Sequence, residues 1–268
     1  MTDILEKIIA HKRIEIEQQK AFINKKKLAS SCHTTRPHAS MRASLATSPL
    51  GIIAEFKRRS PSKGWIKENA QISDIPPAYQ AAGASALSIL TDMEFFGGSL
   101  TDIQIARSLI QLPILRKDFI IDKFQIYQAH MAGADAILLI AAALKREQCK
   151  ALAAKAHELG MEVLLEIHSE PELDYIDQHI DMVGVNNRNL GTFHTDVKNS
   201  FRLAKKLPSD ILWVSESGIS HPDIVRQLRE AGFRGFLIGE HFMKSTDAGE
   251  ALRDFVNRLS DPALTNIN

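Results

Sequence analysis

Charged side chains stand near the ends of several short apolar runs in this sequence. The first such run is IIAEFK at 52–57, in which Glu55 and Lys57 are two residues apart. Because side chains alternate between the two faces of a strand, these two groups point to the same side. A carboxylate and an ammonium held together shift each other's pKa, which suits acid–base chemistry.

Other apolar runs end in the same way. Lys117 ends the run ILRK and shares its strand face with Leu115 and Phe119, so this lysine points inward. The remaining polar groups at run ends are Glu166, Asn186 with Arg188, and Glu216 with Ser217. One such residue is usually solvated, but two lysines and two glutamates in one small opening carry a high desolvation cost unless they are paired or used. We therefore expect an acid–base site, with Glu55 and Glu166 as the partners of Lys117.

Three neighbours of these groups have simpler interpretations. Arg116 and Asp118 lie on the opposite strand face to Lys117, and we expect them to form ion pairs outside the sheet. His168 follows the run that holds Glu166, and we interpret it as a loop histidine.

Glycines follow the last two apolar runs, in the pairs Ser217-Gly218 and Gly239-Glu240. Glycine lets the backbone approach an anion closely, and loops at these positions of many barrels bind phosphate through N–H groups. The loop RRSPSKG at 58–64, which contains Ser60, adds hydroxyls and positive charge. These three segments predict a phosphorylated small-molecule substrate.

Eight β-rich runs that alternate with helical patterns must position these groups. The predicted strands are 51–57, 86–90, 114–117, 136–140, 162–167, 182–186, 211–215 and 235–238, and the predicted helices are 72–82, 100–109, 123–131, 145–159, 171–178, 197–206, 222–230 and 247–259. Several helices end in Ala-Gly or Leu-Gly, where glycine supplies a left-handed cap. Alternation of this kind implies parallel strands, and eight units favour a closed barrel. No glycine-rich dinucleotide motif follows the first strand, which disfavours a Rossmann fold.

The fold class is therefore α/β, a (β/α)8 TIM barrel with an extra N-terminal helix. We expect a single domain over 1–268, with a helical extension at 1–50 and the barrel at 51–268. Apolar residues at Ile4, Leu5, Ile8 and Ile9 form one face of the first helix, which we expect to cover the barrel. The polar stretch from Lys25 to Ser48 reads as irregular.

Composition narrows the class of protein further. The chain has 268 residues and a formal net charge of +1, so bulk attraction to nucleic acid or an anionic membrane is not expected. Cys32 and Cys149 lack a metal-type spacing and read as reduced thiols, and no signal peptide or transmembrane-length run is present. We expect a cytoplasmic enzyme without a metal or other cofactor. No residue pattern specifies an oligomeric state, and a monomer is the form that we expect.

Taken together, these segments resemble the indole-3-glycerol-phosphate synthase family of tryptophan biosynthesis. The matching segments are IAEFKRRSPSKG (53–64), LSILTDMEFFGGS (87–99), PILRKDFIIDKFQIYQAHMAGADAILLIAAAL (113–144), VGVNNRNLGT (183–192), VSESGI (214–219) and FLIGEHFM (236–243). The resemblance spans the barrel and is highly specific. It implies a carboxy-lyase that converts 1-(2-carboxyphenylamino)-1-deoxyribulose 5-phosphate to indole-3-glycerol phosphate, with release of CO₂ and water. Because decarboxylation restores aromaticity, no electron-sink cofactor is needed.

The resemblance also implies roles for individual residues. Lys117 becomes the general acid of ring closure, and Glu166 the acid–base group for loss of water. Glu55 and Lys57 flank the anthranilate end, with Lys57 near the departing carboxylate. The other implied residues are Asn186 and Ser217, which orient the intermediate; Arg188 and Glu216, which support that polar layer; Ser60, Gly218, Gly239 and Glu240, which bind phosphate; and Phe95, Phe96, Phe119 and Leu138, which enclose the aromatic ring.

Three alternatives remain open at this point. Phosphoribosylanthranilate isomerase is another phosphate-binding barrel, but that family is shorter and lacks both the N-terminal extension and the LRKDF segment. A Schiff-base aldolase using Lys117 is distinguished by borohydride trapping of an adduct. A non-catalytic binding barrel gives no reason for two lysines and two glutamates at one opening.

Overall fold

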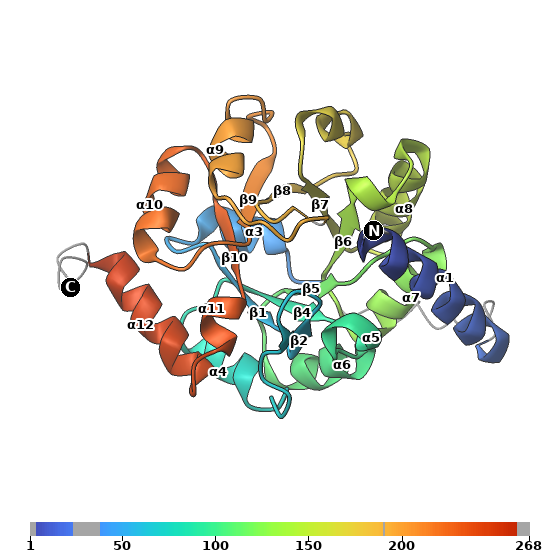
Figure 1. Cartoon of the computed structure of the whole chain (residues 1–268), viewed down its shortest axis with the longest axis horizontal. Helices are drawn as coiled ribbons and strands as arrows, with labels where there is room; N and C mark the ends of the chain where they lie inside the picture. Colours follow the sequence, from blue (N-terminus) through green and yellow to red (C-terminus); the bar gives the residue numbers. More distant parts are fainter. Residues whose placement is uncertain (1–3, 24–37, 190, 262–268) are drawn as a thin grey trace.

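Eight parallel strands close into a barrel in the computed structural model, which describes residues 4–23, 38–189 and 191–261 (Figure 1). The strands are β1 (Ile52–Phe56), β4 (Ala86–Leu90), β5 (Ile114–Lys117), β6 (Ala136–Ile140), β7 (Glu162–Ile167), β8 (Met182–Asn186), β9 (Leu212–Glu216) and β10 (Gly235–Ile238). Each strand pairs with its sequence neighbour in the barrel, and β10 pairs with β1 to close it. The predicted fold class is therefore confirmed. Since all strands are parallel, their carboxyl ends meet at one end of the barrel, here called the mouth.

A ring of helices surrounds the strands (Figure 1). It consists of α4 (Ile75–Ala81), α6 (Leu100–Leu109), α7 (Lys123–Ala132), α8 (Arg146–Glu158), α9 (Lys198–Ala204), α10 (Pro222–Glu230) and α12 (Ala248–Ser260). The glycine that follows each of α4, α7, α8 and α10 has a positive φ of 77–109°. Glycine adopts this left-handed conformation without steric cost, so the predicted helix ends are confirmed.

The predicted helix at 171–178 is wrong in type. This segment forms the 3-10 helix η2 (Glu170–Tyr175), which ends at Ile176 in extended backbone. Leu173 and Ile176 are three residues apart, and both pack against the core around the barrel. Two core contacts three residues apart, the second of them beyond the end of η2, do not require a full α-helix.

Several short elements were not expected from the sequence. They are α3 (Met41–Thr47), the antiparallel hairpin β2 (Arg59–Ser60) and β3 (Gly64–Trp65), α5 (Met93–Phe96), η1 (Ala141–Ala143) and α11 (Glu240–Met243). The helix α3 contradicts the expectation of irregular chain as far as Ser48, and residues 24–37 of that stretch lie outside the described residues. Ser40 caps the N-terminus of α3 by accepting a hydrogen bond from the Ala43 N–H. This helix start was not recognised because the surrounding sequence is mostly polar.

The two larger apolar cores of the described chain hold the barrel together. One fills the space between the strands and the surrounding helices, and the other fills the barrel interior. Met41 and Leu45 of α3 are fully buried in the interior core, and Ser44 donates a hydrogen bond to the Ser85 carbonyl just before β4. Helix α3 therefore closes the end of the barrel opposite the mouth.

Helix α1 (Ile4–Phe22) packs beside α7 and η1, at the mouth end of the interior core (Figure 1). Its Lys12 is 1% exposed, and the ammonium lies 2.7 Å from Asp92 and 3.1 Å from Asp118. These aspartates follow β4 and β5, and Asp118 also pairs with Arg116 at 2.8 Å. The expected ion pair outside the barrel thus exists, and it includes a lysine of the N-terminal helix.

Candidate active site

A cavity of about 780 Å³ opens at the mouth of the barrel. All of the site residues proposed from the sequence line this cavity, with the exception of Phe95. Phe95 instead lies on α5 with its ring edge-on to His11 of α1, at a centroid distance of 5.6 Å. Phe95 therefore holds α1 in place and does not form part of the wall.

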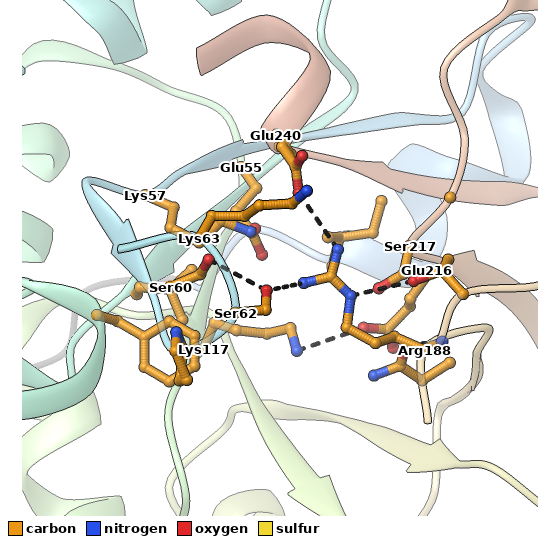
Figure 2. Close-up of a pocket in the computed structure, with 18 of the residues that line it drawn as sticks. Glu55, Lys57, Ser60, Ser62, Lys63, Lys117, Arg188, Glu216, Ser217 and Glu240 are labelled. Atoms are coloured by element: carbon orange, nitrogen blue, oxygen red, sulfur yellow. Dashed lines mark hydrogen bonds and ion pairs between the residues drawn. The ribbon is translucent and has the colours of Figure 1, made fainter. Parts of the chain in front are cut away.

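Lys117 occupies the centre of the charged layer, and Figure 2 shows its ammonium turned toward the carboxylates of the mouth. The Nζ atom donates a hydrogen bond of 3.0 Å to Glu166 Oε2 and lies 3.4 Å from Glu216 Oε2. Burial by itself lowers the pKa of Lys117, but the carboxylates of Glu166, Glu216 and Glu55 outweigh it and hold that pKa well above the usual value. Lys117 is therefore a charged proton donor.

The two carboxylates beside Lys117 have opposite properties. Burial by itself raises the pKa of Glu166, yet the ammonium of Lys117 and a hydrogen bond of 3.0 Å from Asn186 Nδ2 bring the pKa below its usual value. For Glu216, burial raises the pKa, and the nearby negative charges of Glu166 and Glu55 offset the effect of Lys117. Glu166 is thus a carboxylate, whereas Glu216 readily holds a proton.

Glu55 is a partner of Lys117 only at longer range: its charge helps to raise the pKa of Lys117, but the direct ion pairs of Lys117 are with Glu166 and Glu216. Glu55 instead accepts a hydrogen bond of 2.6 Å from Lys57 Nζ, which confirms that these two side chains share a strand face. Its other oxygen lies 3.4 Å from the Ser88 hydroxyl on β4. Glu55 is thus paired with Lys57 of its own strand. The second carboxylate close to Lys117 is that of Glu216, on β9 across the barrel.

Two glycines make room for the buried carboxylates. A Cβ atom at Gly184 on β8 would lie 2.0 Å from Glu216 Oε1, and one at Gly239 would lie 2.5 Å from Glu55 Oε1. Any side chain at either position would displace a carboxylate of the mouth. Sequence reasoning missed Gly184 altogether and assigned Gly239 to phosphate binding alone. A larger residue at Gly239 would therefore disturb Glu55 as well as any bound anion.

A polar layer fixes the loops after β8 and β9. Asn187, which sequence reasoning missed, donates through Nδ2 to the Ser217 carbonyl at 3.1 Å. Ser217 has a φ of +69°, a left-handed conformation that is costly for a residue with a side chain. Arg188 spans the opening, donating to Ser62 at 3.1 Å and to Glu240 at 3.2 Å (Figure 2). These contacts preorganise the rim of the cavity.

One end of the cavity is suited to an anion. Ser60, Gly218, Gly239 and Glu240 line it together with Lys63 and Lys244. The Glu240 carboxylate is paired with Arg188 at 3.2 Å and with Lys244 at 2.5 Å, which neutralises its charge. Positive side chains, hydroxyls and backbone N–H groups of the glycine loops are the groups that bind phosphate in proteins.

The other end is apolar. Phe96, Phe119 and Leu138 line it, with the two phenylalanine rings 5.9 Å apart. Ile4, Leu5 and Ile8 of α1 complete this wall, so α1 contributes to the cavity in addition to covering the barrel. The apolar face of this helix is visible in the sequence, but its place over the mouth is not.

Two observations bear on cofactors and on membranes. Within the residues that the structure describes, no cluster of three or more His, Cys, Asp or Glu is arranged to hold a metal ion. His168 does lie near the site, with Nε2 3.4 Å from Glu166 Oε1. Every helix in the described part of the chain is too short or too polar to cross a membrane.

Comparison with known proteins agrees with this geometry. The family model described as indole-3-glycerol phosphate synthase matches residues 5–255. An indole-3-glycerol phosphate synthase of Bacteroides thetaiotaomicron is 62% identical over 259 residues, which cover 97% of this chain and all of that protein. The same enzyme of a Polaromonas species is 46% identical over 257 residues, covering 94% of this chain and 97% of the relative.

Solved structures of more distant proteins share the fold. The tryptophan synthase α subunit of Legionella pneumophila superposes with a TM-score of 0.61 at 16% identity, covering 85% of this chain and 98% of that one. The thiamine phosphate pyrophosphorylase of Pyrococcus furiosus superposes with a TM-score of 0.59 at 14% identity, with coverage of 82% and 98%. At these identities the likeness concerns the barrel alone.

Proposed function

The chain belongs to the indole-3-glycerol phosphate synthase family, and from that premise we propose which of its side chains carry the reaction. The substrate is the phosphorylated 1-(2-carboxyphenylamino)-1-deoxyribulose, and the products are indole-3-glycerol phosphate, CO₂ and water. The observation that carries the proposal is the charged Lys117, which lies between the two ends of the cavity, one suited to an aromatic ring and the other to a phosphate.

Ring closure requires a proton on the ketone oxygen while an aromatic carbon attacks the ketone carbon. Lys117 supplies this proton, because the carboxylates around it keep it as an ammonium. Lys57 lies beside the substrate carboxylate, whose negative charge it balances until CO₂ leaves. Glu55 holds Lys57 in position through the 2.6 Å hydrogen bond.

Loss of water requires a base for the proton that the new ring releases. Glu166 has this role, because its lowered pKa keeps it ionised and the Asn186 amide fixes its orientation. Ser217 and Arg188 line the same part of the cavity and orient the intermediate. Glu216 also belongs to this layer, through its position 3.4 Å from Lys117.

The substrate lies across the mouth in one direction. Its phosphate binds at the end formed by Ser60, Gly218, Gly239 and Glu240, and its anthranilate ring lies among Phe96, Phe119, Leu138 and the first turns of α1. This orientation brings the ketone between the two ends, where Lys117 is located. Binding both ends holds the reacting carbons together, which lowers the entropic cost of ring closure.

The Schiff-base alternative is disfavoured by the same electrostatics. A nucleophilic lysine needs a lowered pKa so that the free amine is populated at neutral pH. Lys117 has a raised pKa because three carboxylates surround it. We therefore expect borohydride to leave the enzyme active in the presence of substrate.

We further propose a single-domain, monomeric enzyme that works in the cytoplasm. In support of one domain, α1 and α3 contribute side chains to the core inside the barrel. In support of a monomer, residues of one chain form both ends of the cavity and its charged layer. In support of the location, the similar enzymes named above are bacterial biosynthetic enzymes.

The direct test is incubation with the carboxyphenylamino substrate while indole fluorescence is recorded. Appearance of the fluorescence with stoichiometric release of CO₂ is the expected result. If the protein instead isomerises phosphoribosylanthranilate and forms no indole, the proposed function is wrong. A non-catalytic barrel would bind the substrate and produce neither signal.

A further inference from the structure

Glu216 differs from the other carboxylates of the mouth. Its side chain is 1% exposed, and within the described chain neither of its oxygens accepts a hydrogen bond. Glu166, in contrast, accepts a hydrogen bond of 3.0 Å at each oxygen, and Glu55 accepts one of 2.6 Å from Lys57. The Lys117 Nζ atom is close to Glu216, at 3.4 Å, but this distance is too long for a good hydrogen bond.

The charges of the layer point to the same residue. Three carboxylates, those of Glu55, Glu166 and Glu216, face two ammonium groups, those of Lys57 and Lys117. The imidazole of His168, 3.4 Å from Glu166, is a further titratable group in contact with them. A buried carboxylate without hydrogen bonds is strongly disfavoured, whereas the neutral acid loses far less on leaving water. Burial together with the charges of Glu166 and Glu55 raises the pKa of Glu216. Of the three, Glu216 is therefore the carboxyl group best suited to hold a proton.

The reaction needs more than one proton at the same atom. The ketone oxygen takes up one proton to become a hydroxyl and a second to leave as water, while the ring releases one proton. The net uptake of one proton per turnover matches the charge lost when a carboxylate leaves as neutral CO₂. After ring closure Lys117 is a neutral amine, and it must be recharged before it acts again.

We propose that Glu216 is a proton store, which enters turnover as a neutral acid and recharges Lys117 between ring closure and loss of water. This inference rests on the proposed function of Lys117. In the transfer, the O–H bond of Glu216 breaks and an N–H bond forms on the Lys117 amine, which leaves a carboxylate and an ammonium. The transfer is downhill because an amine is far more basic than a carboxylate.

The cycle closes without any other reactant. Lys117 gives its second proton to the departing hydroxyl and becomes an amine once more. Glu166 takes the ring proton and returns it to Lys117 across 3.0 Å, and solvent supplies one proton to Glu216. The count is two protons delivered to oxygen, one recovered from the ring and one taken from water.

The test is a single-turnover comparison of the full-length enzyme with Glu216→Gln, which has the shape of the neutral acid but no proton to give. Release of CO₂ and formation of the indole chromophore are recorded in parallel. In the variant we expect CO₂ release within a few-fold of the wild-type rate, and indole formation slowed by at least ~10²-fold, as for loss of an acid–base group. The hydroxylated, decarboxylated intermediate should accumulate.

Other outcomes are informative in different ways. If the two signals slow equally, Glu216 acts at or before ring closure, and if neither slows, it stores no needed proton; both results overturn the inference. Failure of the wild-type enzyme to form indole would instead refute the proposed function.

An infrared measurement needs only the wild-type protein, so it remains decisive even if the variant does not fold. The infrared spectrum at pH 7 is expected to contain the absorption band of a protonated carboxyl group, that of Glu216. Its absence contradicts the inference.

Discussion

Replacement of Gly184 by alanine is the sharpest test of how the fold positions the charged layer. The new methyl carbon would lie 2.0 Å from Glu216 Oε1 and 3.4 Å from Leu164 Cδ1. Ordinary contact needs ~3.5 Å, so the carboxylate must retreat by ~1.5 Å. Glu216 would then leave its position beside Lys117, while the alternating pattern of β8 and β9 stays the same.

The expected effect has two parts. Overpacking of a core by one methyl group costs ~1–3 kcal/mol of unfolding free energy. Displacement of an active-site group by about 1 Å lowers the rate by up to ~10²-fold. We therefore expect Gly184→Ala to fold, to lose ~1–3 kcal/mol by denaturant titration, and to show a kcat reduced by ~10–10²-fold with KM little changed.

A matched control separates packing from chemistry. Gly235 lies on β10, where a Cβ atom would meet Val214 Cγ2 at 2.8 Å and Leu45 Cδ1 at 3.2 Å, away from the charged layer. Gly235→Ala should lose similar stability and retain its kcat. An equal loss of kcat in both variants would mean that the effect of Gly184→Ala is general loosening of the barrel.

A double-mutant cycle closes the argument. In a Glu216→Ala background the clash is absent, so adding Gly184→Ala should cost much less unfolding free energy than it does in the wild-type protein. This is the non-additivity expected of two residues in contact. If the cost in that background equals the cost in the wild-type protein, Gly184 does not act through Glu216, and the steric reasoning is refuted.

Three further predictions concern other contacts. Lys117→Met should bind substrate but lower kcat by at least ~10²-fold. Without the lysine the pKa of Glu166 rises, so its ionisation favours the unfolded chain and the melting temperature of the variant should fall as pH rises from about 5 to 8. A melting temperature that does not change with pH would contradict this. Burial alone raises the pKa of Asp118, but Lys12 and Arg116 outweigh it and hold that pKa well below the usual value, so the stabilisation is present above about pH 4 and is lost as pH falls. Lys12→Met should therefore lose ~3–5 kcal/mol at pH 7 and show a weaker acid dependence, which thermal melts from pH 3 to 8 would measure. Inorganic phosphate at 100 times its Kd should stabilise the enzyme by ~2.7 kcal/mol, and in a soaked crystal it should lie beside Gly218; an anion elsewhere in the mouth would argue against the assigned phosphate end.

Much of the architecture could be predicted from local patterns. The strand faces of Glu55, Lys57 and Lys117 follow from alternation along single strands, and the eight β-rich runs and capping glycines follow from composition over a few residues. In a parallel barrel these ends meet at one mouth, so the cavity-lining residues could be predicted without coordinates.

The extension before the barrel shows where local pattern stops being informative. Its first helix was evident from one apolar face, but α3 was not, because Met41 and Leu45 are its only buried positions. Two apolar residues make a weak period on their own. Their role in closing one end of the barrel depends on the barrel interior, which is formed by strands far away in the sequence.

Which groups contact each other was decided only by the tertiary structure. The choice of Glu216 over Glu55 beside Lys117 depends on the stagger of strands around the closed barrel, which relates residues 99 positions apart in the sequence. Gly184 likewise matters only because the Glu216 carboxylate occupies the space that a side chain at this position would take. Alternation within a strand is a property of neighbouring residues, whereas the pairing and the pKa of buried charges are set by distances across the barrel, and those distances exist only once the barrel has closed.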